Sequence, residues 1–138
     1  MQWNPYVVFN GNCEAAFKFY QRCLGGTLVA MVPYGDMPSE GQVPAELSSK
    51  IMHARLMVGN QLLMGADAHA AQPYEGVKGC SVALQVETPE EAETVFKSLG
   101  ENGTIVMPLE KTFWAVRFGM LIDQYGVPWM INCENPRC

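Results

Sequence analysis

Apolar runs and helical stripes alternate along the chain and predict the same series of elements twice. In the first half, residues 6–9 form a β-branched and aromatic run that is typical of a strand. Residues 13–24 carry apolar side chains at helical spacing, with Asn12 as the expected N-cap and Gly25-Gly26 as the stop. Further strands are expected over 28–32, 51–58 and 61–64.

The second half repeats this order. A strand is expected over 82–86, followed by a helix that begins at the capping box Thr88-Pro89-Glu90-Glu91 and ends near Gly100. A shift of 76 residues places Asn12 on Thr88 and Ala16 on Ala92. Further strands are expected over 104–107, 113–122 and 127–132. The repeat predicts an internal duplication. We expect an α+β fold in which one domain, 1–138, contains two βαβββ modules over about 1–66 and 79–138.

Two connecting segments interrupt the pattern. The segment 66–79 is polar and rich in turn-forming residues, and it separates the modules. The segment Pro33–Lys50 contains several Pro and Gly residues and has no clear periodicity. A loop of this length is often functional. Two interpretations stay open: a lid over a pocket, or a plain or dimer-contacting loop.

Composition and charge narrow the class of protein. The 138 residues suit one domain, and nine basic against fourteen acidic residues give a net charge of −5. This acidic balance argues against non-specific nucleic-acid binding and against an anionic membrane surface. No apolar run approaches the ~18 residues of a membrane span, and the N-terminus does not resemble a signal peptide. We therefore expect a cytoplasmic protein with no nucleic-acid or membrane partner.

Two βαβββ modules set side by side would form a curved mixed sheet with helices outside and a cup inside. Ligand sites usually lie in such a concavity, lined by apolar groups and a few polar ones. The candidates for this lining are Phe9, His53, Arg55, Met64, Phe113, Trp114, Arg117, Trp129 and Met130. The tryptophans and methionines are equally compatible with an ordinary core.

Four polar residues each allow two interpretations. His53 lies inside an apolar run and is either a structural histidine or a group that contacts ligand or transfers protons. Arg55 and Arg117 occupy equivalent strands, either at solvated edges or inside the cup, where they would favour an anionic ligand. Glu110 is either a surface charge or a general base. His53 and Glu110 are therefore weak catalytic candidates.

The sequence resembles the PhnB-like branch of the vicinal oxygen chelate superfamily, which includes glyoxalase I, bleomycin-resistance proteins and extradiol dioxygenases. The matching motifs cover nearly the whole chain: Pro5-Tyr6, Asn10-Gly11-Asn12, His53-Ala54, Thr112-Phe113-Trp114, Phe118-Gly119, Tyr125-Gly126-Val127 and Trp129-Met130-Ile131-Asn132. The resemblance implies the paired βαβββ fold and, commonly, a homodimer. It does not imply an activity.

The resemblance also allows a test for a metal site. Metal enzymes of the superfamily place His, Glu or Gln at four strand positions, which fall here near Pro5 or Tyr6, Leu63 or Met64, Ser81, and Trp129 or Met130. These residues offer no imidazole or carboxylate, whereas a divalent ion needs several N or O donors. We predict no cofactor and disfavour a divalent metal.

Three functional hypotheses follow. The first is a metal-free protein that binds a small molecule in its cup. The second is a metal-assisted lyase, isomerase or dioxygenase that acts on a small carbonyl or aromatic compound. The third is a structural or regulatory homodimer. Whether the protein is an enzyme stays open at this stage.

Overall fold

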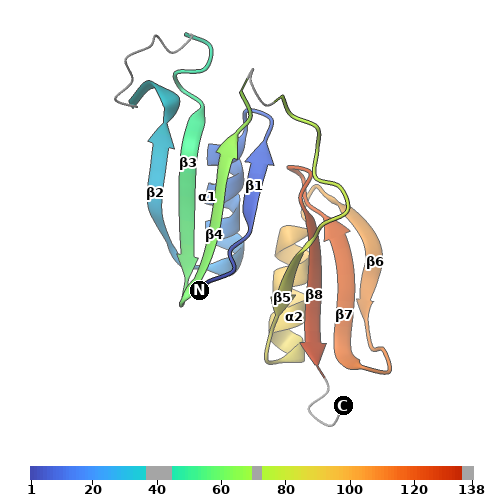
Figure 1. The fold of residues 1–138 in the computed structure, drawn as a ribbon. Coiled ribbons are helices and arrows are strands. Elements are labelled where there is room, and N and C mark those ends of the chain that lie inside the picture. Colours follow the sequence, from blue (N-terminus) through green and yellow to red (C-terminus); the bar gives the residue numbers. More distant parts are fainter. Residues whose placement is uncertain (37–44, 70–72, 135–138) are drawn as a thin grey trace. The chain divides into compact units, whose positions relative to one another are not determined.

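The protein contains two βαβββ units in the computed structural model, which describes residues 1–36, 45–69 and 73–134 (Figure 1). The first unit spans Met1–Gly76 and the second Val77–Cys138. The predicted fold class, α+β with two βαβββ modules, is confirmed. The expectation that the two modules together form one cup depends on how the units are placed relative to each other, and it stays a prediction.

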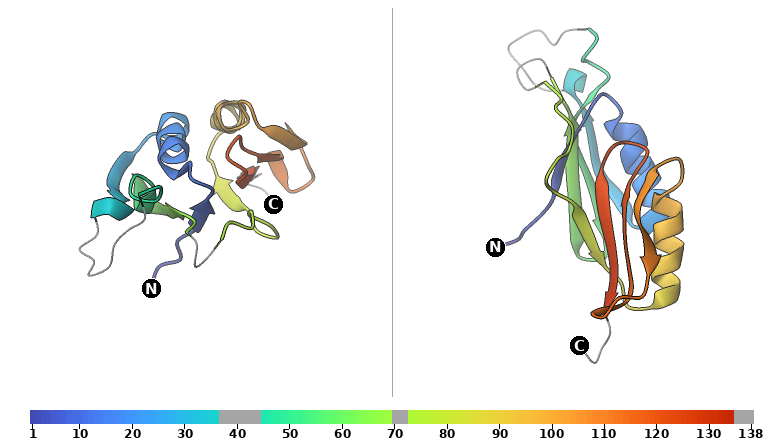
Figure 2. Two further views of the ribbon diagram at one scale, coloured as in Figure 1. Left: turned by 90° about the horizontal axis from the view of Figure 1, so that it is seen from above. Right: turned by 90° about the vertical axis from the view of Figure 1, so that its right-hand side faces the viewer.

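The first unit follows the predicted order of elements. Its secondary structure consists of β1 (Tyr6–Phe9), α1 (Cys13–Leu24), β2 (Thr27–Pro33), the 3₁₀ turn η1 (Tyr34–Asp36), β3 (Ile51–Val58) and β4 (Gln61–Asp67). The sheet order is β1-β4-β3-β2, with β1 parallel to β4 and the other pairs antiparallel. Figure 2 shows α1 on one face of this sheet, and no α-helix among the described residues of the unit covers the opposite face.

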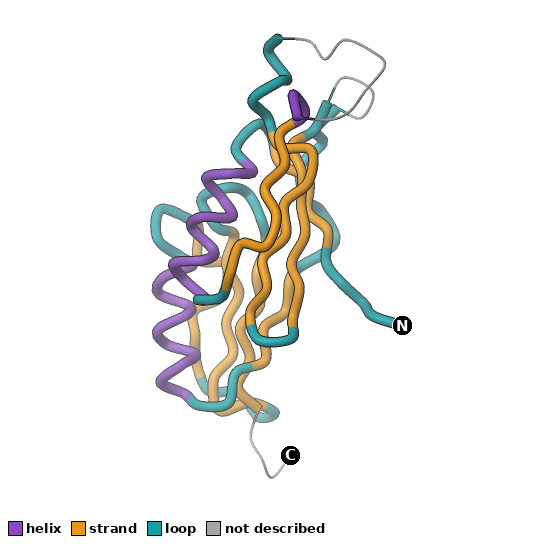
Figure 3. Tube along the Cα trace, turned by 90° about the vertical axis from the view of Figure 1, so that its left-hand side faces the viewer, coloured by secondary structure: helices purple, strands orange, loops and turns teal. Residues whose placement is uncertain are grey.

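The second unit repeats this topology. It contains β5 (Val82–Gln85), α2 (Pro89–Leu99), β6 (Thr104–Glu110), β7 (Ala115–Ile122) and β8 (Pro128–Glu134). The sheet order is β5-β8-β7-β6, and β5 again pairs in parallel with the last strand. Each unit is thus a layer of strands and one helix, as Figure 3 shows. The equal topologies support the predicted duplication.

Strand alternation places the core of the first unit between β1 and α1. Val7 and Phe9 are buried, whereas their neighbours Tyr6 and Val8 are exposed on the other face. The Phe9 ring packs edge-on against Phe17 of α1, with ring centroids 5.9 Å apart. Phe9 is therefore a core residue, and its predicted place in the ligand-facing lining disagrees with the period-two alternation of β1.

A glycine allows α1 to approach this sheet closely. A Cβ atom at Gly65 would lie 2.7 Å from Cε1 of Phe17 and 2.8 Å from the carbonyl oxygen of Val7. Both distances are shorter than an ordinary van der Waals contact. Gly65 is thus required by the close packing of the helix on β4.

The two helices begin in different ways. Thr88 caps α2 as predicted, since its hydroxyl accepts a hydrogen bond from the Glu91 N–H at 3.1 Å. Asn12 occupies the N-cap position of α1, but its side chain makes no capping hydrogen bond. The carboxylate of Asp67 accepts from the Cys13 N–H instead, at 2.9 Å. The predicted capping role of Asn12 is therefore wrong, because a residue of β4 supplies the acceptor.

In the part of the chain that the structure describes, no helix is long and apolar enough to span a membrane. The predicted loop Pro33–Lys50 begins with η1 and ends in a turn over 45–49. The middle of this loop, 37–44, lies outside the described residues. The hypothesis that the loop is a lid concerns these residues and stays a prediction.

Candidate functional site

A pocket of about 520 Å³ lies within the first unit, on the face of the sheet opposite α1. Exposed Tyr6 and Val8 of β1 lie on this face, because their alternates Val7 and Phe9 point toward the helix. The residues that line it are Tyr6, Val8, Tyr34, Met52, Ala66, Asp67, Ala68, His69, Pro73, Tyr74, Glu75 and Gly76. The volume falls within the range of small-molecule sites, roughly 300–1,000 Å³.

A β-bulge accounts for the presence of Met52 in this pocket. Val32 of β2 pairs with His53, and the next residue, Pro33, pairs with Ile51, so Met52 is an extra residue on β3. Bulges change the direction of a side chain relative to strict alternation. Ile51 is buried, while Met52 is half-buried and lines the pocket.

The ring of Tyr34 is fixed in position by the fold. Its N–H donates to the Lys50 carbonyl at 2.8 Å, and its hydroxyl donates to the Asp67 carbonyl at 2.9 Å. The ring also lies edge-on to His69, with centroids 6.0 Å apart and an interplanar angle of 80°. One wall of the pocket is therefore preorganised rather than a loose side chain.

Asp67 joins three parts of the unit beneath the pocket. The residue is only 2% exposed. Its Oδ1 accepts from the Cys13 N–H at 2.9 Å, and its Oδ2 accepts from the Ile51 N–H at 2.8 Å. A buried carboxylate needs such partners to offset its desolvation. Asp67 thus holds the start of α1 and the start of β3 to the end of β4, next to the pocket.

Two phenols of the pocket, those of Tyr6 and Tyr34, stay protonated at neutral pH. Burial raises the pKa of Tyr34 above its ordinary value of 10.0, and repulsion between its phenolate and the ionised forms of Tyr6, Asp67 and Cys13 raises the pKa further. Burial, followed by the charge of Cys13, raises the pKa of Tyr6 as well. Tyr6 and Tyr34 are therefore neutral hydroxyls at pH 7, able to donate and accept hydrogen bonds.

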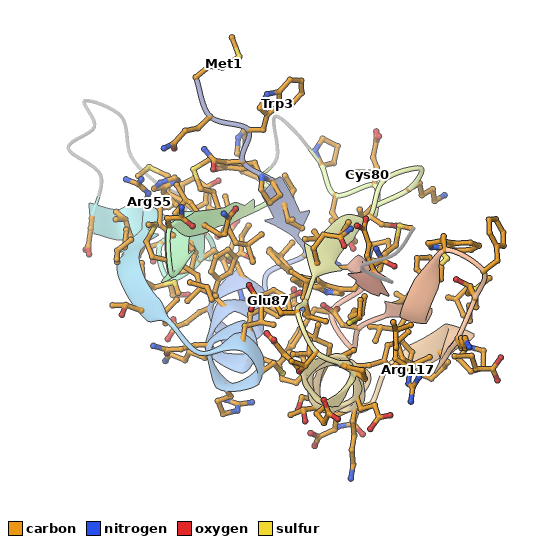
Figure 4. The ribbon with its side chains drawn as sticks, turned by 90° about the horizontal axis from the view of Figure 1, so that it is seen from below. Met1, Trp3, Arg55, Cys80, Glu87 and Arg117 are labelled. Carbon is orange, nitrogen blue, oxygen red and sulfur yellow. The ribbon has the colours of Figure 1, made fainter. Side chains whose placement is uncertain are left out.

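Two of the predicted site residues lie on the pocket side of the first sheet. His53 stacks on Tyr6, with ring centroids 6.2 Å apart and an interplanar angle of 27°, so it supports a ring of the lining. Arg55 is exposed and pairs with Met64 in the sheet. Figure 4 shows Arg55 on the side of the sheet away from α1. Neither His53 nor Arg55 is among the lining residues.

The other predicted site residues belong to the second unit. Phe113 is 89% exposed and lies edge-on to Trp114, with centroids 4.8 Å apart. Arg117 forms an ion pair with Glu93 of α2, with Nε and Oε1 3.3 Å apart, and Figure 4 shows it beside that helix. Glu110 is exposed on β6. These side chains do not line the pocket of the first unit.

Trp129 is a core residue of the second unit. It is 1% exposed, and its indole N–H donates to Oδ2 of Asp123 at 2.8 Å. Oδ1 of Asp123 accepts from the N–H groups of Tyr125 and Val127, at 2.8 and 3.1 Å, and so closes the predicted turn before β8. The placement of Trp129 in a ligand-facing lining disagrees with this burial, because its face of β8 packs inward.

None of the residues that line the pocket belongs to the lining predicted from the sequence. Tyr34, His69 and Tyr74 lie in connecting segments, where no periodicity indicates the direction of a side chain. Tyr6 and Val8 could have been found, since strict alternation with the buried Phe9 places them on the opposite face.

The expected metal positions do not offer suitable donors. In the first sheet Tyr6 pairs with Met64, and in the second Val82 pairs with Trp129 and Ala83 with Met130. A phenol of raised pKa and thioethers are poor ligands for the divalent ions that carboxylate and imidazole hold. Within residues 1–36, 45–69 and 73–134, no three His, Cys, Asp or Glu side chains group closely enough to hold a metal ion. The residues present do not fit the metal.

Comparison with known proteins identifies the relatives of this chain. The sequence model of the Glyoxalase/Bleomycin resistance protein/Dioxygenase superfamily matches residues 2–131. Protein YjdN of Escherichia coli (strain K12) is 36% identical over 140 residues, which cover 96% of this chain and 95% of YjdN.

Two solved structures extend the comparison to three dimensions. Protein PA1353 from Pseudomonas aeruginosa is 54% identical, with a TM-score of 0.90 over 97% of this chain and 98% of that chain. The PhnB protein from Bacillus cereus is 28% identical, with a TM-score of 0.78 over 96% of this chain and 99% of that chain.

Proposed function

The chain belongs to the Glyoxalase/Bleomycin resistance protein/Dioxygenase superfamily, and from this premise we propose that it binds a small organic molecule in the pocket of its first unit. The proposed binding does not depend on a metal held by the protein's own side chains. The observation that carries the proposal is the tyrosine-lined pocket, which combines a suitable volume with an apolar floor and a few fixed polar groups.

The chemistry of the lining supports binding rather than metal-assisted catalysis. Val8, Met52 and Ala66 supply apolar surface, while the tyrosines add aromatic rings and hydroxyl groups to the lining. The two catalytic candidates, His53 and Glu110, belong to different units and do not line the pocket. The lyase, isomerase or dioxygenase hypothesis therefore has less support than the binding hypothesis.

The direct test is a fragment screen on the ¹⁵N-labelled full chain by NMR, followed by a variant that fills the pocket. We expect some fragments to shift the amide signals of Ala66, Ala68 and neighbouring lining residues. Val8→Trp should abolish those shifts, because Val8 lines the pocket and is 40% exposed there. The matched control is Val29→Trp, at a position on β2 that is 50% exposed and outside the lining.

Two outcomes would overturn the binding proposal. The first is a screen in which no fragment perturbs the lining residues. The second is a set of shifts that Val8→Trp leaves intact. Elemental analysis of protein purified without chelators tests the metal-free part separately: one tightly held transition metal per chain would contradict it.

A second candidate function, self-association as a homodimer, is favoured by one observation. Strand β6 lies at an edge of the second sheet and exposes Ile105, Val106 and Met107, each by 44–55%. An exposed apolar edge strand is a template for pairing with another chain unless it is covered. We propose that a second copy of the chain covers it.

The dimer hypothesis is tested by light scattering coupled to size exclusion over a range of concentrations. Val106→Lys should shift the protein toward monomer, whereas Val29→Lys, at an equally exposed position on an edge strand of the other sheet, should not. A wild-type chain that stays monomeric at all concentrations, or equal masses for wild type and Val106→Lys, would contradict this hypothesis.

A further inference from the structure

We propose that the pocket of the first unit selects small organic cations, meaning molecules that present an alkylammonium group, over neutral and anionic analogues. This inference rests on the proposed function and names its class of ligand. It comes from three features of the described lining: its aromatic rings, the exposed carboxylate of Glu75 and the absence of Lys and Arg among its residues.

Three tyrosines from separate segments contribute to the lining. Tyr6 comes from β1, Tyr34 from η1, and Tyr74 from the segment that follows β4. The face of a phenol ring carries negative electrostatic potential and attracts cations that lie over it. Several aromatic rings around one space are the arrangement that recognises quaternary ammonium groups.

The rings are held in place before a ligand arrives. Tyr34 is fixed by the hydrogen bond from its hydroxyl to the Asp67 carbonyl, and Tyr6 is stacked on His53. Binding would therefore order few side chains, which preserves affinity.

One exposed charge belongs to the described lining, the carboxylate of Glu75. The carboxylate of Asp67 is buried, and both its oxygens already accept backbone N–H groups, from Cys13 and from Ile51. None of the described residues that line the pocket is Lys or Arg. An anionic ligand would be repelled by Glu75 and would find no Lys or Arg partner in this lining, whereas a cation would be attracted to Glu75.

The basic groups elsewhere in the unit are placed away from this lining. The Lys50 ammonium donates to the Gly11 carbonyl at 3.0 Å, and Arg55 lies outside the lining on an exposed part of β3. The anionic ligand that Arg55 and Arg117 would favour therefore receives no support from this pocket.

The inference can be tested with three probes of nearly equal shape. Choline carries a trimethylammonium group, 3,3-dimethylbutan-1-ol is its neutral isostere, and 3,3-dimethylbutanoate is an anionic analogue. Each is titrated into the ¹⁵N-labelled full chain while the amides of the lining are observed. We expect choline to bind about tenfold or more tightly than the alcohol, and the anion to bind most weakly.

Two pairs of variants separate the ring and charge contributions. Tyr74→Phe keeps an aromatic face and should retain most of the choline affinity, whereas Tyr74→Leu should lose several-fold of it and leave the alcohol unaffected. Glu75→Gln should weaken choline several-fold. Glu14→Gln on α1, on the other side of the sheet, makes the same change in net charge and should have no effect.

Each outcome of the titration has a defined meaning. Equal affinities for choline and the alcohol, or tighter binding of the anion, would overturn the charge selectivity while leaving the pocket as a binding site. Absence of shifts with all three probes, when the fragment screen does shift the lining, would overturn the cation inference alone. Failure of both experiments would overturn the proposed function itself.

Discussion

Replacing Asp67 by asparagine is expected to lower the free energy of unfolding by about 2–4 kcal/mol. The perturbation keeps the size of the side chain and removes its charge. Because Asp67 is 2% exposed and accepts two backbone hydrogen bonds, water cannot replace the lost partner without opening the structure.

The magnitude follows from the two contacts. Each carboxylate oxygen accepts one N–H, from Cys13 at 2.9 Å and from Ile51 at 2.8 Å. A hydrogen bond to a charged group contributes about 1.5–3 kcal/mol, and a neutral one roughly half as much. An amide can keep one acceptor oxygen but turns an NH₂ group toward the other N–H. One bond is therefore lost and the other is weakened, and relief of the buried charge offsets part of the cost.

The assay is equilibrium unfolding in urea, followed by far-UV circular dichroism. With a denaturant slope of about 2 kcal/mol/M for a domain of this size, the midpoint should fall by about 1–2 M. The amides of Cys13 and Ile51 should also exchange with deuterium faster than in the wild type, because they lose their acceptor.

The control is Asp36→Asn, which makes the same chemical change at an exposed aspartate of η1. It should alter the stability by no more than about 0.5 kcal/mol. If Asp67→Asn is as stable as Asp36→Asn, the interpretation of Asp67 as the link between α1, β3 and β4 is refuted.

Three further predictions concern packing, thiol reactivity and pH. Gly65→Ala should lower the free energy of unfolding in urea by about 1–3 kcal/mol, because the new Cβ would clash with Phe17. If the variant were as stable as the wild type, the close approach of α1 to the sheet would be contradicted. Iodoacetamide should alkylate exposed Cys80 in the native protein but should alkylate Cys13 only after unfolding. Burial raises the pKa of the Cys13 thiol, and the charges of its acidic neighbours raise it further. Mass spectrometry that finds Cys13 alkylated as fast as Cys80 in the native protein would disprove this. The pKa of Tyr34 is raised in the folded protein, so the contribution of its protonated hydroxyl to stability is fully present below pH 10.0 and is lost as the pH rises above that value. Urea midpoints measured from about pH 9 to about pH 11 should therefore fall less steeply in Tyr34→Phe than in the wild type. Parallel curves for the two proteins would argue against a raised pKa of Tyr34.

Local patterns in the sequence were sufficient to predict the architecture. The apolar stripe of residues 13–24, the capping box at Thr88 and the repeated order of elements each depend on residues that are neighbours in the chain. The spacing of apolar residues fixes which face of a helix is buried. Among the described residues, both α-helices and the eight strands were predicted, with boundaries that differ by a few residues, whereas the 3₁₀ turn η1 was not.

The candidate site was predicted less well, for reasons visible at particular residues. The alternation of β1 directs Phe9 inward and Tyr6 outward, but the sequence does not state which face carries the helix. The bulge that brings Met52 into the pocket depends on the pairing of β2 with β3. Single-sequence patterns do not encode such a register shift.

The sequence by itself determined the class of fold, the duplication and the resemblance to a superfamily, because these depend on periodicities of two and 3.6 residues and on short motifs. The tertiary structure alone decided which aromatic residues surround a pocket and which acceptor caps α1. Asp67 lies 54 residues from Cys13 in the chain, yet its Oδ1 is only 2.9 Å from the Cys13 backbone nitrogen in the folded protein. Only the folded chain brings such distant groups into contact, so the tyrosine-lined pocket is a property of the packing of the strands and not of any one segment.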